Sequence, residues 1–388
     1  MKILVVGSPH SASTRDVWIG AMKGLGANGA GVQSYDMLPR GEFFSTLVDF
    51  VREKHMPIPM LSHVPSPMVL AYEPVFMAAH WHEVDVVFFI SPQYIPLELP
   101  QMLRKDGFKV WAYMTECPYE DPIDAPQKAE CFDFVFLNDR NSESYWRMYN
   151  PNSHYIPHSY DPDKHFPWWA PPEGKVRHDI KNGHDHVTYV GSGFGRRQKY
   201  LEDVDWTGID LKVYGHWPLL TPPASDRDKE QFAPMLGVQT FEGFKTWEDL
   251  PPTYESPIKK YVLPKMVENS FTARLYRGSA IGINMHRLER WANNAEQLID
   301  EGDAYSMGPR GVELAACGTF QLSDFRQEIV DVFGDSVPLH RNPDELGRLI
   351  RKYLDDPVSR ESLARQQHEA IKERTFANHM RRVLELAA

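Results

Sequence analysis

Cysteine is scarce in this chain of 388 residues, which has only three, and none of them lies in a Cys-x-x-Cys or Cys/His spacing. This scarcity argues against a disulfide scaffold and a structural zinc site, and it fits reduced thiols in a cytoplasmic protein. Long apolar runs are also missing. Runs such as Val84–Ile90 are far shorter than the roughly 20 residues of a membrane span, and the run after Met1 is too short for a secretory signal. We therefore expect a soluble protein without a membrane span.

Basic residues are fewer than acidic ones, with 42 Lys and Arg against 53 Asp and Glu, so the formal net charge is −11 at pH 7. Such a chain has no general attraction to nucleic acid or to an anionic membrane, although a local basic patch would be compatible with this total. Apolar residues are not scarce, at 42% of the chain. Together with its length, this composition suits two domains of ordinary size, each with its own core.

Short strand-like runs alternate with helical patterns in both halves of the chain. The first half has predicted strands at Lys2–Gly7, Gly31–Met37, Val84–Ile90, Lys109–Thr115 and Phe134–Asn138, and a predicted helix at Val69–His82. The second half has predicted strands at His186–Gly191, Leu211–Gly215, Ala280–Met285, Thr319–Leu322 and Ser336–Leu339. Apolar strands that are each followed by a helix indicate an α/β fold with doubly wound parallel sheets.

Two further segments of the second half are predicted to be helical. One lies around Leu288–Ile299, and the other is a tail from Asp344 to Leu386 with breaks near Pro357 and Thr375. Between the halves, His158–Pro172 is rich in proline and aromatic residues, which is typical of a stiff linker. We therefore expect a first domain over residues 1–168 and a second over 169–370.

The segment Gly308–Asp324 is the most informative part of the sequence. It contains a short helix that begins near Arg310, carries Glu313 and stops at Gly318 before another strand. Free backbone N–H groups beside an arginine and an acid suit a ligand with phosphates and sugar hydroxyls, so Arg310 would bind the phosphates and Glu313 a ribose. The alternative is an i,i+3 ion pair in solvent, worth a few tenths of a kcal/mol. We favour the nucleotide-sugar site, because the apolar residues after Glu313 predict a tightly packed helix.

A glycine-rich turn follows the first strand of the second half. Gly191, Ser192 and Gly193 are followed closely by Arg196 and Arg197. Such a turn lets backbone N–H groups approach a diphosphate, which either arginine could neutralise. A tight turn with two solvated arginines is the alternative. The position of the turn, between a strand and a helix, favours phosphate contact.

Another strand of the second half ends in polar residues. Asn284, His286 and Arg287 follow or end the strand Ala280–Met285, and they are further candidates for the nucleotide site. Ligands of open parallel sheets bind beyond the carboxyl ends of the strands, where we also expect the Arg310 segment. An ordinary polar strand end is the alternative.

Candidate acid–base residues of the first half are Glu116, His10 and His82, the last with its neighbour His80. Glu116 ends a predicted strand, so it could act as a base on an acceptor or simply cap the next segment. Each histidine could face a ligand, although a histidine in such a position is more often a surface or packing residue.

Three passages of the sequence resemble CgeB-like glycosyltransferases of the spore maturation protein type. They are Trp111–Tyr119 with Tyr155–Pro167, Thr188–Arg197 with Val213–Gly215, and Leu275–Arg287 with Arg310–Gly318 and Tyr353–Pro357. The resemblance runs from about residue 109 to the end of the chain. It implies the GT-B fold, with two Rossmann-like domains facing across a cleft. The first would bind the acceptor and the second a nucleoside-diphosphate sugar, and the helix at 371–388 would cross back to the first domain.

The sequence departs from the pattern of related enzymes at one position. In related GT-B enzymes that retain the anomeric configuration, two glutamates stand eight positions apart, and the second binds the ribose of the donor. Glu313 matches the second glutamate, whereas the first position is occupied by Tyr305. The stereochemical outcome therefore stays open. If the outcome is inversion, the reaction needs a base on the acceptor hydroxyl.

The expected function is sugar transfer from a nucleotide sugar, with a UDP-sugar as first choice. No DxD spacing lies near the expected site, so we expect no metal, and arginines and helix amides would stabilise the leaving diphosphate. The acceptor stays open among proteins, small molecules and glycans. Alternatives are a glycosyltransferase that acts on hydroxymethylated DNA bases, and a non-catalytic structural or nucleotide-binding protein of a spore or virion.

Overall fold

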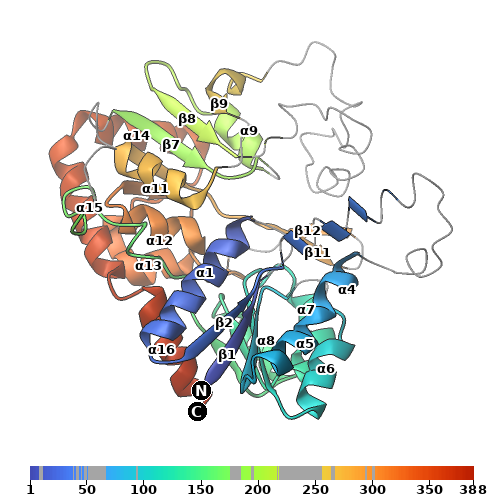
Figure 1. Cartoon of the computed structure of the whole chain (residues 1–388). Coiled ribbons are helices and arrows are strands. Elements are labelled where there is room, and N and C mark those ends of the chain that lie inside the picture. The colour runs from blue at the N-terminus through green and yellow to red at the C-terminus, as the bar shows by residue number, and fades with distance from the viewer. Residues whose placement is uncertain are drawn as a thin grey trace. The chain divides into compact units, whose positions relative to one another are not determined.

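The computed structural model describes most of the chain. The described residues are 1–7, 12–37, 39–40, 43–44, 46–47, 50, 67–92, 95–174, 185–193, 196–215, 217, 256–263, 267–292, 295–298 and 302–388. Contacts between them divide the chain into two units (Figure 1). The first unit comprises Met1–Ser159 and Arg374–Ala388, and the second comprises Tyr160–Glu373. Each unit has its own sheet and core.

A six-stranded parallel sheet forms the centre of the first unit, in the order β2-β1-β3-β4-β5-β6. Its strands are β1 (Lys2–Val6), β2 (Gly31–Tyr35), β3 (Val86–Ile90), β4 (Lys109–Met114), β5 (Phe134–Leu137) and β6 (Ser153–Tyr155). Alternate residues of β1 enter different cores, with Ile3 and Val5 on one face and Leu4 and Val6 on the other. Burial on both faces explains why the strands appear in the sequence as continuous apolar runs.

Helices cover both faces of this sheet (Figure 1). Residues of α1 (Ala12–Ala27) and α16 (Phe376–Leu386) pack on the face that carries Ile3. The opposite face is covered by α4 (Pro67–Tyr72), α5 (Pro74–Trp81), α6 (Glu98–Lys105), α7 (Asp121–Lys128), the 3-10 turn η1 (Ala129–Cys131) and α8 (Ser142–Arg147). The single helix predicted over Val69–His82 is two helices, because Pro74 lacks the N–H that would continue the first one.

The second unit has a five-stranded parallel sheet in the order β13-β10-β7-β8-β9. Its strands are β7 (His186–Val190), β8 (Leu211–Tyr214), β9 (Val262–Leu263), β10 (Ser279–Asn284) and β13 (Phe320–Ser323). From β7 the chain first adds β8 and β9 on one side, and later β10 and β13 on the other. The switch of direction lies between β7 and β10, which is where sheets of this type bind ligands.

Both faces of the second sheet are also covered by helices. Side chains of α9 (Arg197–Glu202) and α14 (Pro343–Asp355) pack on the face that carries Val187 and Ile281. The other face contacts α11 (Asn269–Gly278) and α12 (Gly308–Ala316). The remaining elements of this unit are α13 (Gln327–Phe333), α15 (Pro357–Ile371), and the 3-10 turns η3 (Lys259–Tyr261) and η4 (Gly334–Ser336).

Two predicted elements of the second half are wrong. The segment predicted as a helix over Leu288–Ile299 forms two antiparallel strands, β11 (Glu289–Ala292) and β12 (Ala295–Leu298). Its apolar residues do recur at helical spacing, but the two halves of the segment pair with each other, from Glu289 with Leu298 to Ala292 with Ala295. Instead of a strand at Ser336–Leu339 the structure has η4 and a single bridge between Ser323 and Leu339.

The C-terminal tail follows its prediction closely. Helix α14 ends at Asp355, α15 starts at Pro357, and α16 starts after Thr375, whose side chain accepts the N–H of Asn378. None of the helices that the structure describes combines the length and the apolar character that crossing a bilayer requires. The contact division starts the second unit at Tyr160, whose buried ring joins a cluster with Met307 and Val312.

Candidate functional site

The carboxyl ends of three strands meet at one edge of the second sheet. Gly191 follows β7, Met285 and His286 follow β10, and Asp324 follows β13. Strands β7 and β10 are neighbours, and so are β10 and β13. Most of the sequence-predicted nucleotide residues lie at this edge or on the helices that begin there.

Two arginines converge on the backbone carbonyl of Met285. Nη1 of Arg310, on α12, donates to this oxygen at 3.1 Å, and Nη2 of Arg197, on α9, donates to it at 3.1 Å. Arg197 is buried, and Arg310 is half-buried. Two guanidinium groups that share one acceptor repel each other at short range, and a bound anion would offset that repulsion.

The glycine-rich turn passes closely over these groups. A Cβ atom at Gly191 would lie 2.4 Å from Nη2 of Arg310, and one at Gly193 would lie 2.0 Å from the ring of Trp217. Only glycine therefore fits without displacing a neighbour. The carbonyl of Ser192 accepts from Nη1 of Arg197 at 3.3 Å. The turn is thus fixed directly beside two of the predicted phosphate-binding residues.

Arg196 is held at the same edge by a buried carboxylate. Its Nη2 donates to Oδ2 of Asp324 at 2.9 Å. Asp324 also accepts the backbone N–H of His286 at 3.1 Å and contacts Nδ1 of the same histidine. Asp324 was not among the residues singled out from the sequence, although it lies just beyond the predicted strand Thr319–Leu322 and directly follows β13 in the structure.

Burial and charge determine protonation in this cluster. Burial by itself raises the pKa of Asp324, but His286, His340 and Arg196 outweigh it and hold the pKa well below its usual range. Burial lowers the pKa of His286, against the opposing effect of Asp324. It also lowers the pKa of His340 to about 4. Asp324 is therefore a stable anion that holds Arg196 in place.

Asn284 connects the strand ends to helix α12. Its Nδ2 contacts the carbonyl of Met307 and Oγ of Ser323, each at 3.3 Å, and its Oδ1 lies 3.5 Å from Nη1 of Arg310. Arg287 is half-buried, and its backbone carbonyl accepts from Arg326 at 2.6 Å. Asn284 thus contributes to the alignment of Arg310 with the sheet.

Glu313 lies one helical turn after Arg310 on α12. Its Oε1 accepts from Nδ2 of Asn269 at 2.8 Å. Tyr305, where the family pattern has its first glutamate, is buried, and its hydroxyl donates to Asp331 at 2.9 Å. The structure therefore has one carboxylate, Glu313, at the two positions of that pattern.

Comparisons with known proteins agree on the architecture. Residues 196–385 match a family model described as glycosyl transferase-like, which covers slightly less than half of the chain. HepE of Anabaena in complex with UDP-glucose is similar over 100% of this chain and 99% of its own, with a TM-score of 0.57 and 12% identity. The chain has the GT-B fold.

Two further solved structures illustrate how far this GT-B likeness extends. Sucrose-phosphate synthase of Thermosynechococcus elongatus has a TM-score of 0.56 at 13% identity, covering 100% of this chain and 98% of its own. An alpha-glucosyltransferase (AGT) in complex with UDP has a TM-score of 0.58 at 11% identity, covering both chains completely at 100%. No protein of curated function matches the sequence.

In the first unit of this GT-B chain, the acid–base candidates lie at different places. Glu116 follows β4 at the carboxyl edge, and its carbonyl accepts the N–H of Tyr119 at 2.8 Å in the turn toward α7. His82 caps the end of α5, just before β3, and therefore lies at the amino edge. His80 also lies at that end and pairs with Asp106 at 2.5 Å. His10 lies outside the described residues.

The carboxyl edge of the first sheet carries a polar network that sequence analysis missed. Nδ2 of Asn138 donates to the carbonyl of Thr115 at 2.7 Å and lies 3.0 Å from Nε2 of His158. Ser91 contacts the hydroxyl of Thr115 and has a φ of +48°, which is uncommon for a residue other than glycine. Asn138 is the last residue of a predicted strand, and that position was the available signal.

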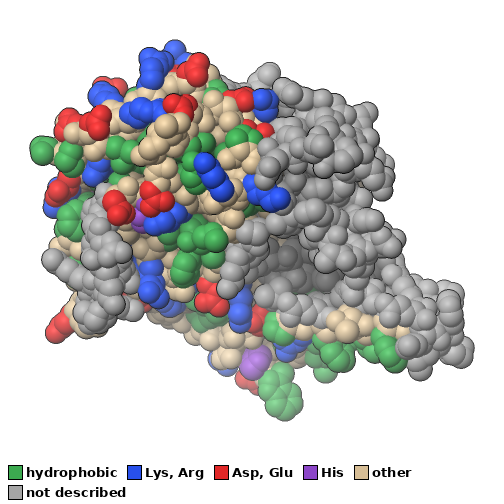
Figure 2. Space-filling model, turned by 90° about the horizontal axis from the view of Figure 1, so that it is seen from above, with side chains coloured by type: hydrophobic (Ala, Val, Ile, Leu, Met, Phe, Trp, Pro, Cys, Tyr) green, Lys and Arg blue, Asp and Glu red, His purple; other side chains and the backbone are tan. Residues whose placement is uncertain are grey.

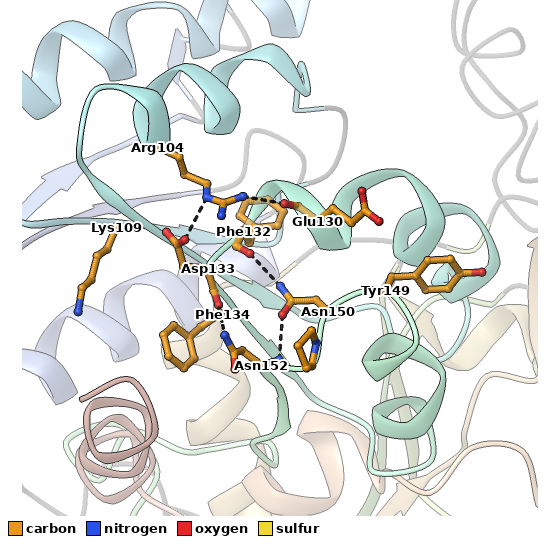
Figure 3. A pocket seen from close by; sticks show the side chains of 10 residues that line it. Arg104, Lys109, Glu130, Phe132, Asp133, Phe134, Tyr149, Asn150 and Asn152 are labelled. Atoms are coloured by element: carbon orange, nitrogen blue, oxygen red, sulfur yellow. Dashed lines mark hydrogen bonds and ion pairs between the residues drawn. The ribbon is translucent and has the colours of Figure 1, made fainter.

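Two grooves of this GT-B chain lie at the amino edges of the sheets. One, of about 460 Å³, is lined by Arg104, Lys109 and Asp133 among others (Figure 3). There Arg104 pairs with Asp133 at 3.0 Å. The other, of about 670 Å³, includes Asp210 in its lining. Neither groove is lined by the arginines at the carboxyl edge of the second sheet.

One group of possible metal ligands occurs among the described residues. Asp185, His186 and Asp210 approach one another at the amino edge of β7 and β8. Asp210 already has a cationic neighbour, because Nζ of Lys212 lies 3.5 Å from its Oδ2. The group is at the opposite end of the strands from Met285, so it does not belong to the arginine site.

The distribution of charged side chains on the face in Figure 2 can be compared with that of nucleic-acid-binding proteins. On the coloured, described part of that face, Lys and Arg side chains are interspersed with Asp and Glu. Nucleic-acid-binding surfaces usually gather basic residues in a stripe or patch. The face in Figure 2 does not have that distribution.

Proposed function

We propose that this chain is a glycosyltransferase of the CgeB-like type, which moves a sugar from a nucleoside-diphosphate sugar to an acceptor hydroxyl. The observation that carries the proposal is the convergence of Arg197 and Arg310 on the Met285 carbonyl beside the Gly191 turn. The glycosyl transferase-like match over residues 196–385 supports the reaction class. A UDP-sugar is the first choice of donor, since two similar structures contain UDP-glucose and UDP.

The arginines would act on the leaving group. When the bond between the anomeric carbon and the phosphate oxygen breaks, the electron pair stays on the diphosphate, whose negative charge increases. Guanidinium groups of Arg197 and Arg310 would offset this charge, and backbone N–H groups of the Gly191 turn would add hydrogen bonds. Arg196, held by Asp324, would be a third cation at the same edge. Under this proposal the leaving diphosphate needs no metal ion.

Glu116 is our choice for the acceptor-side base. It follows β4 at the carboxyl edge of the first sheet, where sheets of this type bind ligands. In an inverting transfer, its carboxylate would take the proton of the acceptor hydroxyl as the oxygen bonds to the anomeric carbon. We further propose a cytoplasmic location, because all three cysteines are free and buried.

The proposal is tested by measuring UDP release from a panel of UDP-sugars, with and without EDTA. We expect hydrolysis or transfer with at least one donor, at a rate that EDTA does not change. Dependence on a divalent cation would contradict the metal-free part. Neither turnover nor binding with UDP-, GDP-, ADP- and dTDP-linked donors would contradict the proposal as a whole.

Tyr305 favours one second candidate, a protein that binds a nucleotide sugar without transferring it. The hydroxyl of Tyr305 is engaged with Asp331, at a position where related retaining enzymes use a glutamate. Binding of UDP without release of sugar from any donor would support this second candidate over the first.

A further inference from the structure

Glu313 is held by a residue from a neighbouring helix. Asn269 is the first residue of α11, and its Nδ2 donates to Oε1 of Glu313 at 2.8 Å. Asparagine near a helix start commonly caps its own helix. Here the residue before it, Glu268, occupies the cap position without a side-chain cap bond. The amide of Asn269 therefore bonds to the carboxylate of Glu313 on α12.

A buried histidine approaches the same carboxylate oxygen. His165 has a side chain that is 4% exposed, and its Nε2 lies 3.8 Å from Oε1 of Glu313. Among the described residues, neither ring nitrogen of His165 makes a well-aligned hydrogen bond, and neither does Oδ1 of Asn269, although the Asn269 side chain is close enough to oppose the lowering of the His165 pKa by burial. A neutral imidazole carries one N–H, and leaving it unpaired inside a protein is costly. The buried imidazole of His165 is therefore a candidate for a hydrogen bond that forms only when a ligand is present.

The segment that carries His165 is fixed against α11. Nη1 of Arg277, on α11, donates to the carbonyl of Lys164 at 2.8 Å, and its guanidinium lies 4.1 Å from the ring centre of Phe166. Both neighbours of His165 in the chain are therefore attached to one helix. This attachment directs the imidazole toward the Glu313 oxygen that accepts the Asn269 amide, at a distance of 3.8 Å from its Nε2.

We propose that Asn269 and His165 are positioning residues, which orient Glu313 toward the ribose hydroxyls and so make the site prefer a ribonucleoside diphosphate to its 2′-deoxy counterpart. This inference rests on the proposed function. Asn269 fixes one carboxylate oxygen, and the N–H of His165 closes onto the same oxygen when the ribose binds. Hydrogen bonds in catalytic sites often shorten in this way once a ligand is present. A deoxyribose would leave the oriented carboxylate without its partner, which is a strong basis for selection.

The test compares the affinities of UDP and 2′-deoxyuridine diphosphate by titration calorimetry. The wild-type chain should bind UDP about tenfold more tightly or better. Asn269→Ala and His165→Phe should each lower this ratio by about threefold or more, because UDP binding weakens while binding of the deoxy compound changes little. Asn269→Gln, which keeps an amide donor, should recover part of the ratio.

A matched control is available on α13. The side-chain amide of Gln327, the first residue of α13, also donates to a carboxylate, because its Nε2 lies 2.8 Å from Oδ1 of Asp331 in an exposed part of the helix. Gln327→Ala should leave the ratio unchanged. If Asn269→Ala does not fold, His165→Phe still decides the matter, since phenylalanine fills a similar volume without polar nitrogens.

The outcomes separate this inference from the proposed function. An unchanged ratio in both Asn269→Ala and His165→Phe overturns the inference, and so does equal weakening of both ligands, which would mark a general structural role. Binding of UDP with either of these results leaves the proposed function intact. If the wild-type chain binds none of UDP, GDP, ADP and dTDP, the proposed function fails and this inference fails with it.

Discussion

The carboxyl edges of the two sheets differ in charge. At the second sheet, Arg196, Arg197 and Arg310 gather at the ends of β7, β10 and β13, with Asp324 as a buried counter-charge. At the first sheet, the strand ends carry the hydroxyl and amide groups of Ser91, Thr115 and Asn138, and the carboxylate of Glu116 follows β4 at the same edge.

Under the proposed function, this difference suits the two edges to different ligands. A diphosphate needs cations and N–H donors, which the second edge supplies. A network of hydroxyl and amide groups suits an uncharged ligand that offers hydroxyls, such as a sugar acceptor. Under that proposal, one type of sheet would serve two kinds of ligand through the few residues that follow its strands.

Removal of the Arg310 side chain should have the largest effect on activity. Arg310→Ala deletes one of two guanidinium groups on the Met285 carbonyl, and we expect kcat/KM for a UDP-sugar to fall about 100-fold. Arg310→Lys should recover only part of this loss, because an ammonium group cannot bind phosphate in a bidentate manner. The control is Arg382→Ala, on the exposed side of α16. Equal activity of Arg310→Ala and wild type would remove Arg310 from the site.

Acid should weaken the second unit through its buried histidines. Burial lowers the pKa of His165 and of His340 to about 4, from 6.5. Between about pH 6.5 and pH 4 the unfolded chain therefore binds more protons than the folded one, so the free energy of unfolding falls as the pH falls. From pH 7 to pH 5 the loss should be about 2 kcal/mol for each histidine.

Urea unfolding at both pH values measures this loss. His165→Phe should remove about half of the combined loss that His165 and His340 cause, because one of the two groups no longer takes up a proton. A pH dependence identical to that of wild type would show that His165 is not the buried neutral group described above.

Gly191 gives a smaller and more local test of the second edge. A Cβ atom there would lie 2.4 Å from Nη2 of Arg310 and 2.8 Å from the hydroxyl of Tyr189. Gly191→Ala should displace the guanidinium and weaken UDP binding about tenfold, as expected for a misplaced charged hydrogen bond. Gly26→Ala is the matched control, since nothing lies within 4 Å of a Cβ atom at that position. Unchanged UDP affinity would mean that Arg310 can reorient without loss.

The smallest expected effect concerns His82. Because it caps α5 at the amino edge of the first sheet, His82→Ala should leave turnover within about twofold of wild type. Glu116→Gln, at the carboxyl edge, should lower kcat with little change in donor affinity. The reverse result, with a silent Glu116→Gln and an inactive His82→Ala, would move the acceptor-side chemistry to the other edge.

The sequence predicted the elements well where a buried apolar run is bounded by residues that end a helix or a strand. Apolar runs such as Val84–Ile90 and Lys109–Thr115 became β3 and β4, and the breaks at Pro357 and Thr375 became helix boundaries. The helix predicted at Leu288–Ile299 was wrong, because helical spacing of apolar residues gave no sign of the pairing between β11 and β12.

The candidate site was predicted only in part. Residues at or just after strand ends, such as Asn284 and His286, could be placed at the edge from topology alone. Asp324, Asn269 and His165 were not singled out, because their roles depend on contacts between segments far apart in the chain. Asn269 lies 44 positions from Glu313 and Asp324 lies 128 from Arg196. Local patterns carry no information about such pairings.

Under the proposed function, Arg197 and Arg310 together hold a diphosphate at the carboxyl edge of the second sheet. The most direct test of this claim is calorimetric titration of the wild-type chain and of the double variant Arg197→Ala/Arg310→Ala with UDP and with uridine. Wild type should bind UDP at least about 100-fold more tightly than uridine, and the double variant should lose this difference. Equal binding of UDP and uridine by wild type, or an undiminished preference for UDP in the double variant, would contradict the claim.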